Sequence, residues 1–219
     1  MHRLRTSVII PVYNAEQAIA GALASVRRQT CPPDEVVVVD DASTDSTVQI
    51  ASQFQGVVVL RRLANGGPAA ARNSGIDAAS GQVLTFLDAD DRWLPAALCA
   101  LLRPLQDDPG VAIVQGQVQD VWPDHTGAPR FGFNLGSAAY RRTVFAQIGR
   151  FDEARRTGED VQFWLRARAG GLTVHRLAEV TLLYQRQADV RPDRGEQYHR
   201  SLLAALRRAR VDNRPDWEQ

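Results

Sequence analysis

The chain has 219 residues, of which 44% are hydrophobic and 23% charged, and its formal net charge is +1. This length is enough for one sizeable hydrophobic core, and the balanced charge provides no overall attraction to nucleic acid or to an anionic membrane. The sequence contains no long apolar run, and its N-terminus leads directly into a predicted strand. Neither a membrane span nor a signal peptide is therefore expected.

Two features of the composition limit the chemistry. Cys31 and Cys99 are the only cysteines and lack metal-site spacing or a CxxC motif, so free buried thiols and a reducing, cytoplasmic location are expected. All 26 residues in the Lys plus Arg count are arginine. The lack of lysine excludes a Walker-type phosphate loop and Schiff-base chemistry. Phosphate groups would therefore have to be bound by arginine, backbone amides or a metal ion.

The first half of the chain alternates between predicted strands and helices. Short apolar, β-branched runs predict buried strands at 7–10, 36–39, 57–60 and 83–87. Helices are predicted between them, at 16–29, after a cap at 43–45, and at 68–76. This alternation predicts an α/β fold with a parallel sheet, helices on both faces and right-handed crossovers. No GxGxxG motif is present, which excludes the dinucleotide-binding version of that fold.

The second half is less regular. Its predicted elements are a helix at 95–105, one or two strands at 111–121, a mobile loop at 124–133, a short helix at 143–148, a helix starting after Gly158, strands at 173–177 and 180–184, and an amphipathic helix at 196–210. No linker long enough to separate two domains is apparent, so residues 1–219 are expected to form a single domain.

Carboxylates follow two of the predicted strands. Asp40 and Asp41 end the second strand, and Asp88, Asp90 and Asp91 follow the fourth. The carboxyl ends of parallel strands meet at one edge of a sheet, so these acids are expected to line a single crevice. Crowded like charges are costly, and a divalent cation usually relieves them. The pattern favours a metal-assisted nucleotide site, and the alternative is acidic turns that only cap helices.

Successive motifs of the chain resemble those of family 2 glycosyltransferases, in the same order and spacing. They are SVIIPVYN at 7–14, VVDDASTD at 38–45, NGGPAAARNSG at 65–75, FLDADDRWLP at 86–95 and GEDVQFWLR at 158–166. The resemblance covers roughly residues 6–187. It implies a GT-A fold, in which a mostly parallel Rossmann-like sheet is followed by an irregular, acceptor-side C-terminal half. It also implies transfer of a sugar from a nucleotide-diphosphate donor, with inversion.

The resemblance assigns roles to individual residues. Contacts with the nucleotide sugar would come from Pro11, Tyr13, Asn14, Asp40, Asp41, Arg72, Asp88 and Ala89. The metal, Mn²⁺ or Mg²⁺, would be held by Asp90 with Asp88, and Asp160 would be the catalytic base. The acceptor side would include Gly136, Ser137 and Glu159.

Several of these residues have a plainer interpretation. Tyr13 would then pack against the edge of the sheet, and Arg72 would be a solvated surface charge. Glu159 and Asp160 would only complement the dipole of a helix. Gln187 stands near a position where the family often has a histidine, so a third protein ligand for the metal is not assigned.

The same reading divides the chain into a nucleotide-sugar-binding half at 1–94, an acceptor and catalytic half at 95–190, and an arginine-rich tail helix at 191–219. The expected partners are a nucleotide-diphosphate sugar, with a UDP-sugar favoured, and a sugar or lipid-linked acceptor, as in polysaccharide, cell-envelope or glycoconjugate synthesis. We expect the tail helix to pack on the body, with peripheral contact to the inner membrane face as the alternative. Rival functions are an inactive nucleotide-sugar-binding module and a nucleotidyltransferase, whose Gly-rich loop would have to stand at 11–14.

Overall fold

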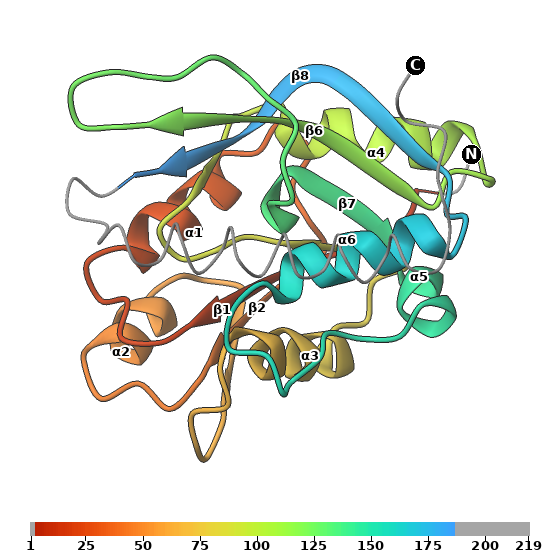
Figure 1. Ribbon diagram of the computed structural model, residues 1–219. Coiled ribbons are helices and arrows are strands. Elements are labelled where there is room, and N and C mark those ends of the chain that lie inside the picture. The colour runs from red at the N-terminus through yellow and green to blue at the C-terminus, as the bar shows by residue number, and fades with distance from the viewer. Residues whose placement is uncertain (1–2, 187–219) are drawn as a thin grey trace.

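The computed structural model describes residues 3–186 (Figure 1). The tail helix expected at 196–210 and Gln187 lie outside this range. The strands are β1 (Thr6–Val12), β2 (Glu35–Asp40), β3 (Val57–Arg61), β4 (Val83–Phe86), β5 (Arg92–Trp93), β6 (Ile113–Val121), β7 (Ala138–Arg141) and β8 (Val174–Gln185). The helices are α1 (Ile19–Arg27), α2 (Thr47–Ser52), α3 (Pro68–Ala78), α4 (Ala97–Asp107), α5 (Arg142–Gln147) and α6 (Glu159–Ala169), with a 3₁₀ turn, η1, at Leu135–Ser137.

The strands of the described residues form one eight-stranded sheet in the order β3-β2-β1-β4-β7-β6-β8-β5. β1 is parallel to both β2 and β4, and β2 is parallel to β3. β7 is antiparallel to β4 and β6, whereas β6 and β8 are parallel. The predicted α/β class with a mostly parallel sheet is thereby confirmed.

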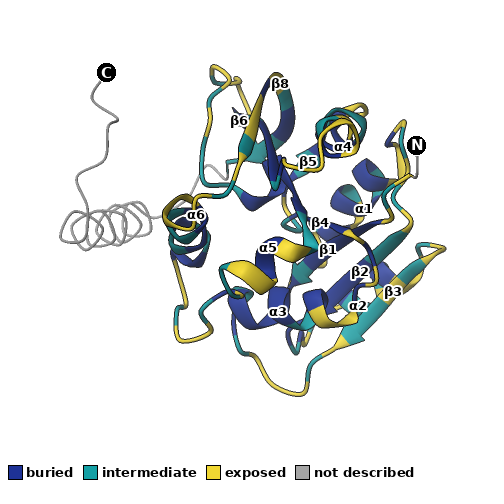
Figure 2. Ribbon diagram, turned by 90° about the vertical axis from the view of Figure 1, so that its right-hand side faces the viewer, coloured by how far each residue is buried: buried dark blue, intermediate teal, exposed yellow. Residues whose placement is uncertain are grey.

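Both faces of the sheet are covered, which explains the continuous apolar runs of its strands. Ile9 of β1 faces the core built with α3, α5 and α6, whereas its neighbours Val8 and Ile10 face the core built with α1 and α2. A third cluster lies under α4. Figure 2 shows the central strands as the most deeply buried part of the molecule. Among residues 3–186, no helix has the length and apolar character needed to cross a bilayer.

Three features of the sheet differ from the prediction. β5 has only two residues and β7 begins with two alanines, so neither has the β-branched pattern by which strands are recognised. The two strands expected at 173–177 and 180–184 form a single strand, β8. Its register against β6 shifts after Gln115, where the apolar pattern is also interrupted.

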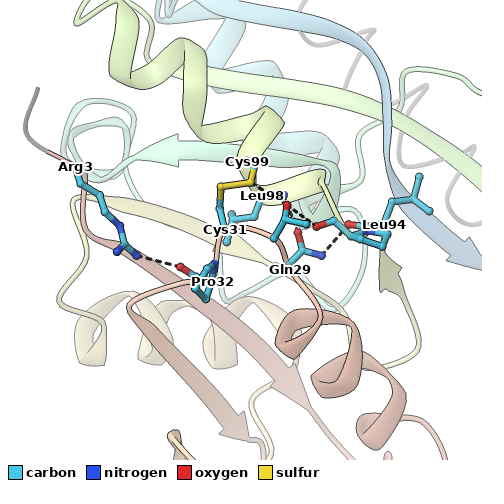
Figure 3. Close-up of a disulfide and its surroundings, with 9 residues drawn as sticks. Arg3, Gln29, Cys31, Pro32, Leu94, Leu98 and Cys99 are labelled. Atoms are coloured by element: carbon cyan, nitrogen blue, oxygen red, sulfur yellow. Dashed lines mark hydrogen bonds between the residues drawn. A yellow bond between two sulfur atoms is a disulfide. The ribbon is translucent and has the colours of Figure 1, made fainter.

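The prediction of free thiols is wrong, because Cys31 and Cys99 form a disulfide (Figure 3). Cys31 follows α1 and Cys99 lies on α4; the two are 68 positions apart in sequence, and their Cα atoms are 5.2 Å apart. The neighbouring Gln29 donates to the carbonyl of Leu94 (2.7 Å) and accepts from the amide of Leu98 (2.9 Å). The pairing depends on this packing, which spacing alone does not reveal. The expectation of a reducing compartment loses its support from the cysteines.

Candidate active site

The ends of β1, β2 and β4 open at one edge of the sheet, where the chain changes direction from β2 and β3 to β4 on the other side of β1. Ligands bind at such a switch point in open α/β sheets. Asn14 follows β1 with a positive φ of 47°. Its amide donates to Ser43 Oγ and its side-chain oxygen accepts from the Thr44 amide, both at 2.9 Å, which joins the first two turns. Tyr13 is 52% exposed, so it is not packed into the sheet edge.

Asp40 and Asp41, at the end of β2, are both buried, but their partners differ. Asp40 is completely inaccessible, accepts from the Ser43 amide at 3.1 Å and lies 3.2 Å from Arg61 Nε. It therefore stabilises the turn behind the crevice. That position fits a supporting residue better than one that contacts a ligand.

Asp41 binds the backbone of the glycine-rich loop at 65–67. One carboxylate oxygen pairs with Arg62 and accepts from the amide of Gly66 (3.0 Å), and the other accepts from the amide of Gly67 (2.7 Å). Gly67 has a φ of 88°, a conformation that favours glycine, and is the N-cap of α3. The loop that begins α3 is thus bound to the end of β2. A shallow pocket beside it is lined by Ala42, Arg61, Arg62 and Leu63.

The three acids after β4 have different environments. Asp90 is exposed and the Asp88 side chain is 44% exposed, whereas Asp91 is 1% exposed and accepts from the amide of Gln185 at 3.1 Å. Surrounding protein atoms and the charge of Asp88 raise the pKa of Asp90. Burial and the charges of Asp88 and Asp90 raise the pKa of Asp91 well above its usual value. Negative charge is crowded here, as the sequence predicts.

The donor set of this turn fits a divalent cation that is shared with a substrate. Within the described residues, no three His, Cys, Asp or Glu side chains are arranged to hold a metal by themselves. Asp88 and Asp90 offer two accessible carboxylates, and Mg²⁺ or Mn²⁺ is commonly held by one or two carboxylates together with phosphate oxygens. The pair is therefore suited to bind a cation once a diphosphate supplies the remaining oxygens.

Arg72 is not a surface charge. It is 5% exposed and lies between two carboxylates, with Nη2 2.7 Å from Asp88 Oδ1 and Nη1 2.6 Å from Glu159 Oε1. Its guanidinium also lies 5.8 Å from the centre of the Phe151 ring. Burial alone would lower the pKa of Arg72, but Asp88 and Glu159 raise it, so the guanidinium stays charged. Arg72 thus links the end of β4 to the start of α6.

Asp160 lies in the first turn of α6, which begins after Gly158 in a left-handed conformation (φ 74°). One of its oxygens accepts from the amide of Val161 at 2.7 Å. Burial, and then the neighbouring charge of Glu159, raise the pKa of Asp160 to about 6. A carboxylate with a pKa close to neutral pH suits a general base. The prediction that acids open this helix is confirmed, and their environment goes beyond complementing the helix dipole.

The remaining predicted residues belong to the ends of β1 and β4 and to the turn before β7. Pro11 lies within β1 opposite Val39, and Ala89 is partly buried in the acidic turn. Gly136 and Ser137 form the buried turn η1.

The η1 turn is held from both sides. The Gly136 carbonyl accepts from Trp93 Nε1 at 2.6 Å, and the Ser137 hydroxyl donates to the carbonyl of Asn134 at 2.9 Å. The hydroxyl of Ser137 is therefore bonded to the backbone three residues earlier, at the start of the same turn. The acceptor-side role of this turn stays a prediction.

Tyr184, at the end of β8, belongs to the stretch that the family resemblance matches near Gln187, but the sequence assigned this tyrosine no role. Burial, followed by the charge of Asp91, raises the pKa of Tyr184 to about 12, with further contributions from Asp88 and Asp90. Its phenol therefore stays protonated beside the acids. The Arg186 guanidinium lies 4.5 Å from the Tyr184 ring centre. Only the pairing of β5 with β8 brings these residues to the crevice, which the sequence does not reveal.

The strand-end acids lie at the switch point of an open α/β sheet, and comparison with known proteins identifies the family. The family model described as "Glycosyl transferase family 2" matches residues 7–161. The chain therefore belongs to glycosyltransferase family 2.

Two curated relatives illustrate this likeness. The poly(ribitol-phosphate) beta-glucosyltransferase of Bacillus spizizenii is 43% identical over 95 residues, which are 40% of this chain and 15% of the relative. Glycosyltransferase AglE of Haloferax volcanii is 36% identical over 152 residues, 65% of this chain and 45% of AglE. The chain thus spans less than half the length of these relatives.

Solved structures share the GT-A fold. Staphylococcus aureus TarS in complex with UDP-GlcNAc has a TM-score of 0.75 at 24% identity, covering 93% of this chain and 66% of TarS. The mannosyltransferase PcManGT of Pyrobaculum calidifontis, in complex with GDP-Man and Mn²⁺, has a TM-score of 0.76 at 21% identity, covering 98% of this chain and 66% of PcManGT. At this level of identity the likeness concerns the fold.

Proposed function

We propose that the chain is an inverting, metal-dependent glycosyltransferase that moves a sugar from a nucleotide-diphosphate donor to an acceptor hydroxyl. One observation carries this proposal. A carboxylate with a pKa of about 6, Asp160, stands next to Glu159 at the start of α6, and Arg72 links Glu159 to Asp88, which shares the acidic turn with the exposed Asp90. General-base chemistry and diphosphate binding need those two features in one site.

The residues of the chain divide the reaction between them. Asp160 accepts the proton of the acceptor hydroxyl, whose oxygen forms a bond to the anomeric carbon while the bond to the diphosphate oxygen breaks. Attack from the face opposite the leaving group inverts the anomeric centre. Asp90 and Asp88 would hold a divalent cation, which would supply positive charge for the leaving diphosphate. Tyr13 offers an exposed ring for the nucleobase and follows Val12, whose carbonyl accepts from the amide of Asp41 at 2.8 Å.

The donor and the acceptor are the finer part of the proposal. We favour a UDP-sugar as donor, since TarS is described with UDP-GlcNAc, although PcManGT is described with GDP-Man. Relatives named for poly(ribitol-phosphate) and teichuronic acid support an acceptor among cell-envelope polymers or their lipid-linked precursors. A cytoplasmic location, with peripheral contact to the inner membrane face, would suit such an acceptor.

Donor binding and turnover test the proposal. Thermal unfolding is measured with nucleoside diphosphates and their sugars, with and without Mn²⁺, because a ligand at ~100 times its dissociation constant adds about 2.7 kcal/mol to stability. Product analysis then follows, with Asp160→Asn as the matched variant. We expect slow, Mn²⁺-dependent release of nucleoside diphosphate that Asp160→Asn lowers by ~10²–10⁴-fold. Release of pyrophosphate would instead identify a nucleotidyltransferase. Binding without turnover, with every acceptor tried, would identify a binding module.

A further inference from the structure

Two adjacent side chains of α3 reach across to the segment that precedes α6. The first is Asn73, which is 6% exposed. Its side-chain amide donates to the carbonyl of Phe151 (2.9 Å) and to Glu153 Oε1 (2.8 Å), and its side-chain oxygen accepts from the amide of Phe151 (3.1 Å). One side chain thus satisfies both backbone groups of Phe151, which fixes the start of the segment to α3.

The second is Arg72, which fixes the other end of the same segment. It binds Glu159, the first residue of α6, and Glu159 is itself only 6% exposed. Residues 152–158, between the two anchors, contain no helix or strand. Its internal contacts form a turn at Asp152, whose side chain accepts from the Ala154 amide (3.1 Å) and pairs with Arg155. The two anchors tie this segment to α3 at both ends, and the second one holds the start of α6.

The contacts of Arg72 limit what else it can bind. Both terminal nitrogens are engaged by protein carboxylates, and the remaining Nε is buried. Arg72 is 5% exposed and both of its terminal nitrogens are paired, so a diphosphate has little access to the guanidinium. Contact with phosphate, the role that the family resemblance implies, is therefore not the role that this geometry supports.

We propose that Arg72, together with Asn73, is a positioning residue that sets the place of Asp160 relative to Asp88. This inference rests on the proposed function, in which Asp160 is the base. The planar, forked guanidinium can hold two carboxylates at once, whereas a lysine ammonium is a point charge without that geometry. A displacement of about 1 Å in a reacting group can cost ~10²-fold in rate. Arg72 thus acts on turnover through Asp160.

The test uses Arg72→Lys and Arg72→Met, each in the wild type and in the Asp160→Asn background. The matched control is Arg150→Ala, because Arg150 also joins this region to α3, through Asp77 at 2.6 Å, but at the surface. We expect Arg72→Met to lower kcat by about 10²-fold with donor affinity changed by less than a few-fold. In the Asp160→Asn background the same change should cost almost nothing more, and Arg150→Ala should have little effect.

Two outcomes would overturn the proposal. A loss of donor affinity as large as the loss of rate would show that Arg72 acts on donor binding, directly or through Asp88, and not through Asp160. If the loss of kcat caused by Arg72→Met is as large in the Asp160→Asn background as in the wild type, Arg72 acts independently of the base. If Arg72→Met does not fold, Arg72→Lys and Glu159→Gln carry the same comparison, since both weaken the link and keep the shape of the site.

A measurement without turnover separates this proposal from the proposed function. Amide hydrogen exchange should become faster in residues 152–162 of the Arg72 variants and stay unchanged in β1 and β2. Unchanged exchange in 152–162 would refute positioning, whatever the enzyme does. If exchange becomes faster in the Arg72 variants but the wild type shows no transfer, or Asp160→Asn keeps its activity, the proposed function is wrong. The contact by which Arg72 positions α6 would still stand.

Discussion

The ionisation of Asp160 determines how transfer should depend on pH. Burial and the charge of Glu159 raise the pKa of this carboxyl from 3.8 to about 6. Only the carboxylate form accepts the acceptor proton, so activity should be lost as the pH falls through about 6. The kcat/KM of the free enzyme is the quantity that reports this pKa.

The size of the effect follows from the shift. One pH unit below its pKa, roughly a tenth of Asp160 is ionised, so kcat/KM at pH 5 should be about tenfold lower than at pH 7. An aspartate with the ordinary pKa of 3.8 would still be more than ~90% ionised at pH 5, and the rate would hardly change.

The same shift has a consequence for stability. The folded pKa lies above the unfolded one, so the protonated form is favoured by folding and the free energy of unfolding falls as the pH rises from about 4 to about 6. About two pKa units correspond to at most ~3 kcal/mol, and less because Asp160 is partly accessible. Asp160→Asn should therefore unfold at a higher temperature than the wild type at pH 7, and the difference should shrink toward pH 4.

The assay is a pH series of kcat/KM from 4.5 to 8 at constant ionic strength, with thermal unfolding of the same samples. Asp152→Asn is a suitable control, since Asp152 precedes α6, is 42% exposed in its side chain and pairs with Arg155. A wild-type profile that stays flat down to pH 5 would refute this account of the base. So would an Asp160→Asn enzyme that keeps the wild-type profile, or an Asp152→Asn enzyme that loses it.

Three further predictions use the same chain. Asp90→Asn should remove the Mn²⁺ dependence of donor binding without unfolding the protein, because this carboxylate is exposed; calorimetry that finds the dependence intact would remove Asp90 from the metal site. Asp160→Asn should lower turnover by ~10²–10⁴-fold. Glu159→Gln should lower it by less, because adjacent helical residues point about 100° apart and Glu159 is turned to Arg72. If steady-state rates show the larger loss for Glu159→Gln, the base is misassigned. Cys31→Ser and Cys99→Ser should each lower the free energy of unfolding by about 4 kcal/mol, the loop entropy expected for a disulfide with a sequence separation of 68. If denaturant unfolding is insensitive to both changes, or to a reductant, the disulfide does not form in solution.

Local patterns were sufficient to predict the first half of the fold. Apolar runs gave β1 to β4 within one or two residues, since strands buried on both faces need no help from distant parts of the chain to be recognised. β5 and β7 carry no such pattern. Their pairing with β8 and with β4 and β6 joins residues far apart in sequence. The disulfide between α1 and α4 was missed for the same reason.

The candidate site shows the same division. The strand-end acids and the helix with Glu159 and Asp160 could be located from sequence, because strand ends and helix starts are local features. The role of Arg72 could not, because its partners are 16 and 87 residues away. The sequence alone is compatible with an exposed Arg72 on the surface of α3. Only the placement of α3 between the end of β4 and the start of α6 shows that this arginine is buried. The contribution of Tyr184 likewise depends on the pairing of β8.

The acidic turn illustrates how the fold assigns different tasks to similar residues. Asp91 is buried and accepts from the backbone amide of Gln185, so it stabilises the end of β8. Asp88 is held by Arg72 through one oxygen, which fixes its orientation while its side chain stays 44% exposed. Asp90 is exposed, and its pKa is raised by its surroundings and by Asp88, so a nearby dication would stabilise its charged form. Of three carboxylates within four residues, Asp90 is the most exposed and therefore the most accessible to a metal ion. We expect the affinity for Mn²⁺ to depend on Asp90 first and on Asp88 second.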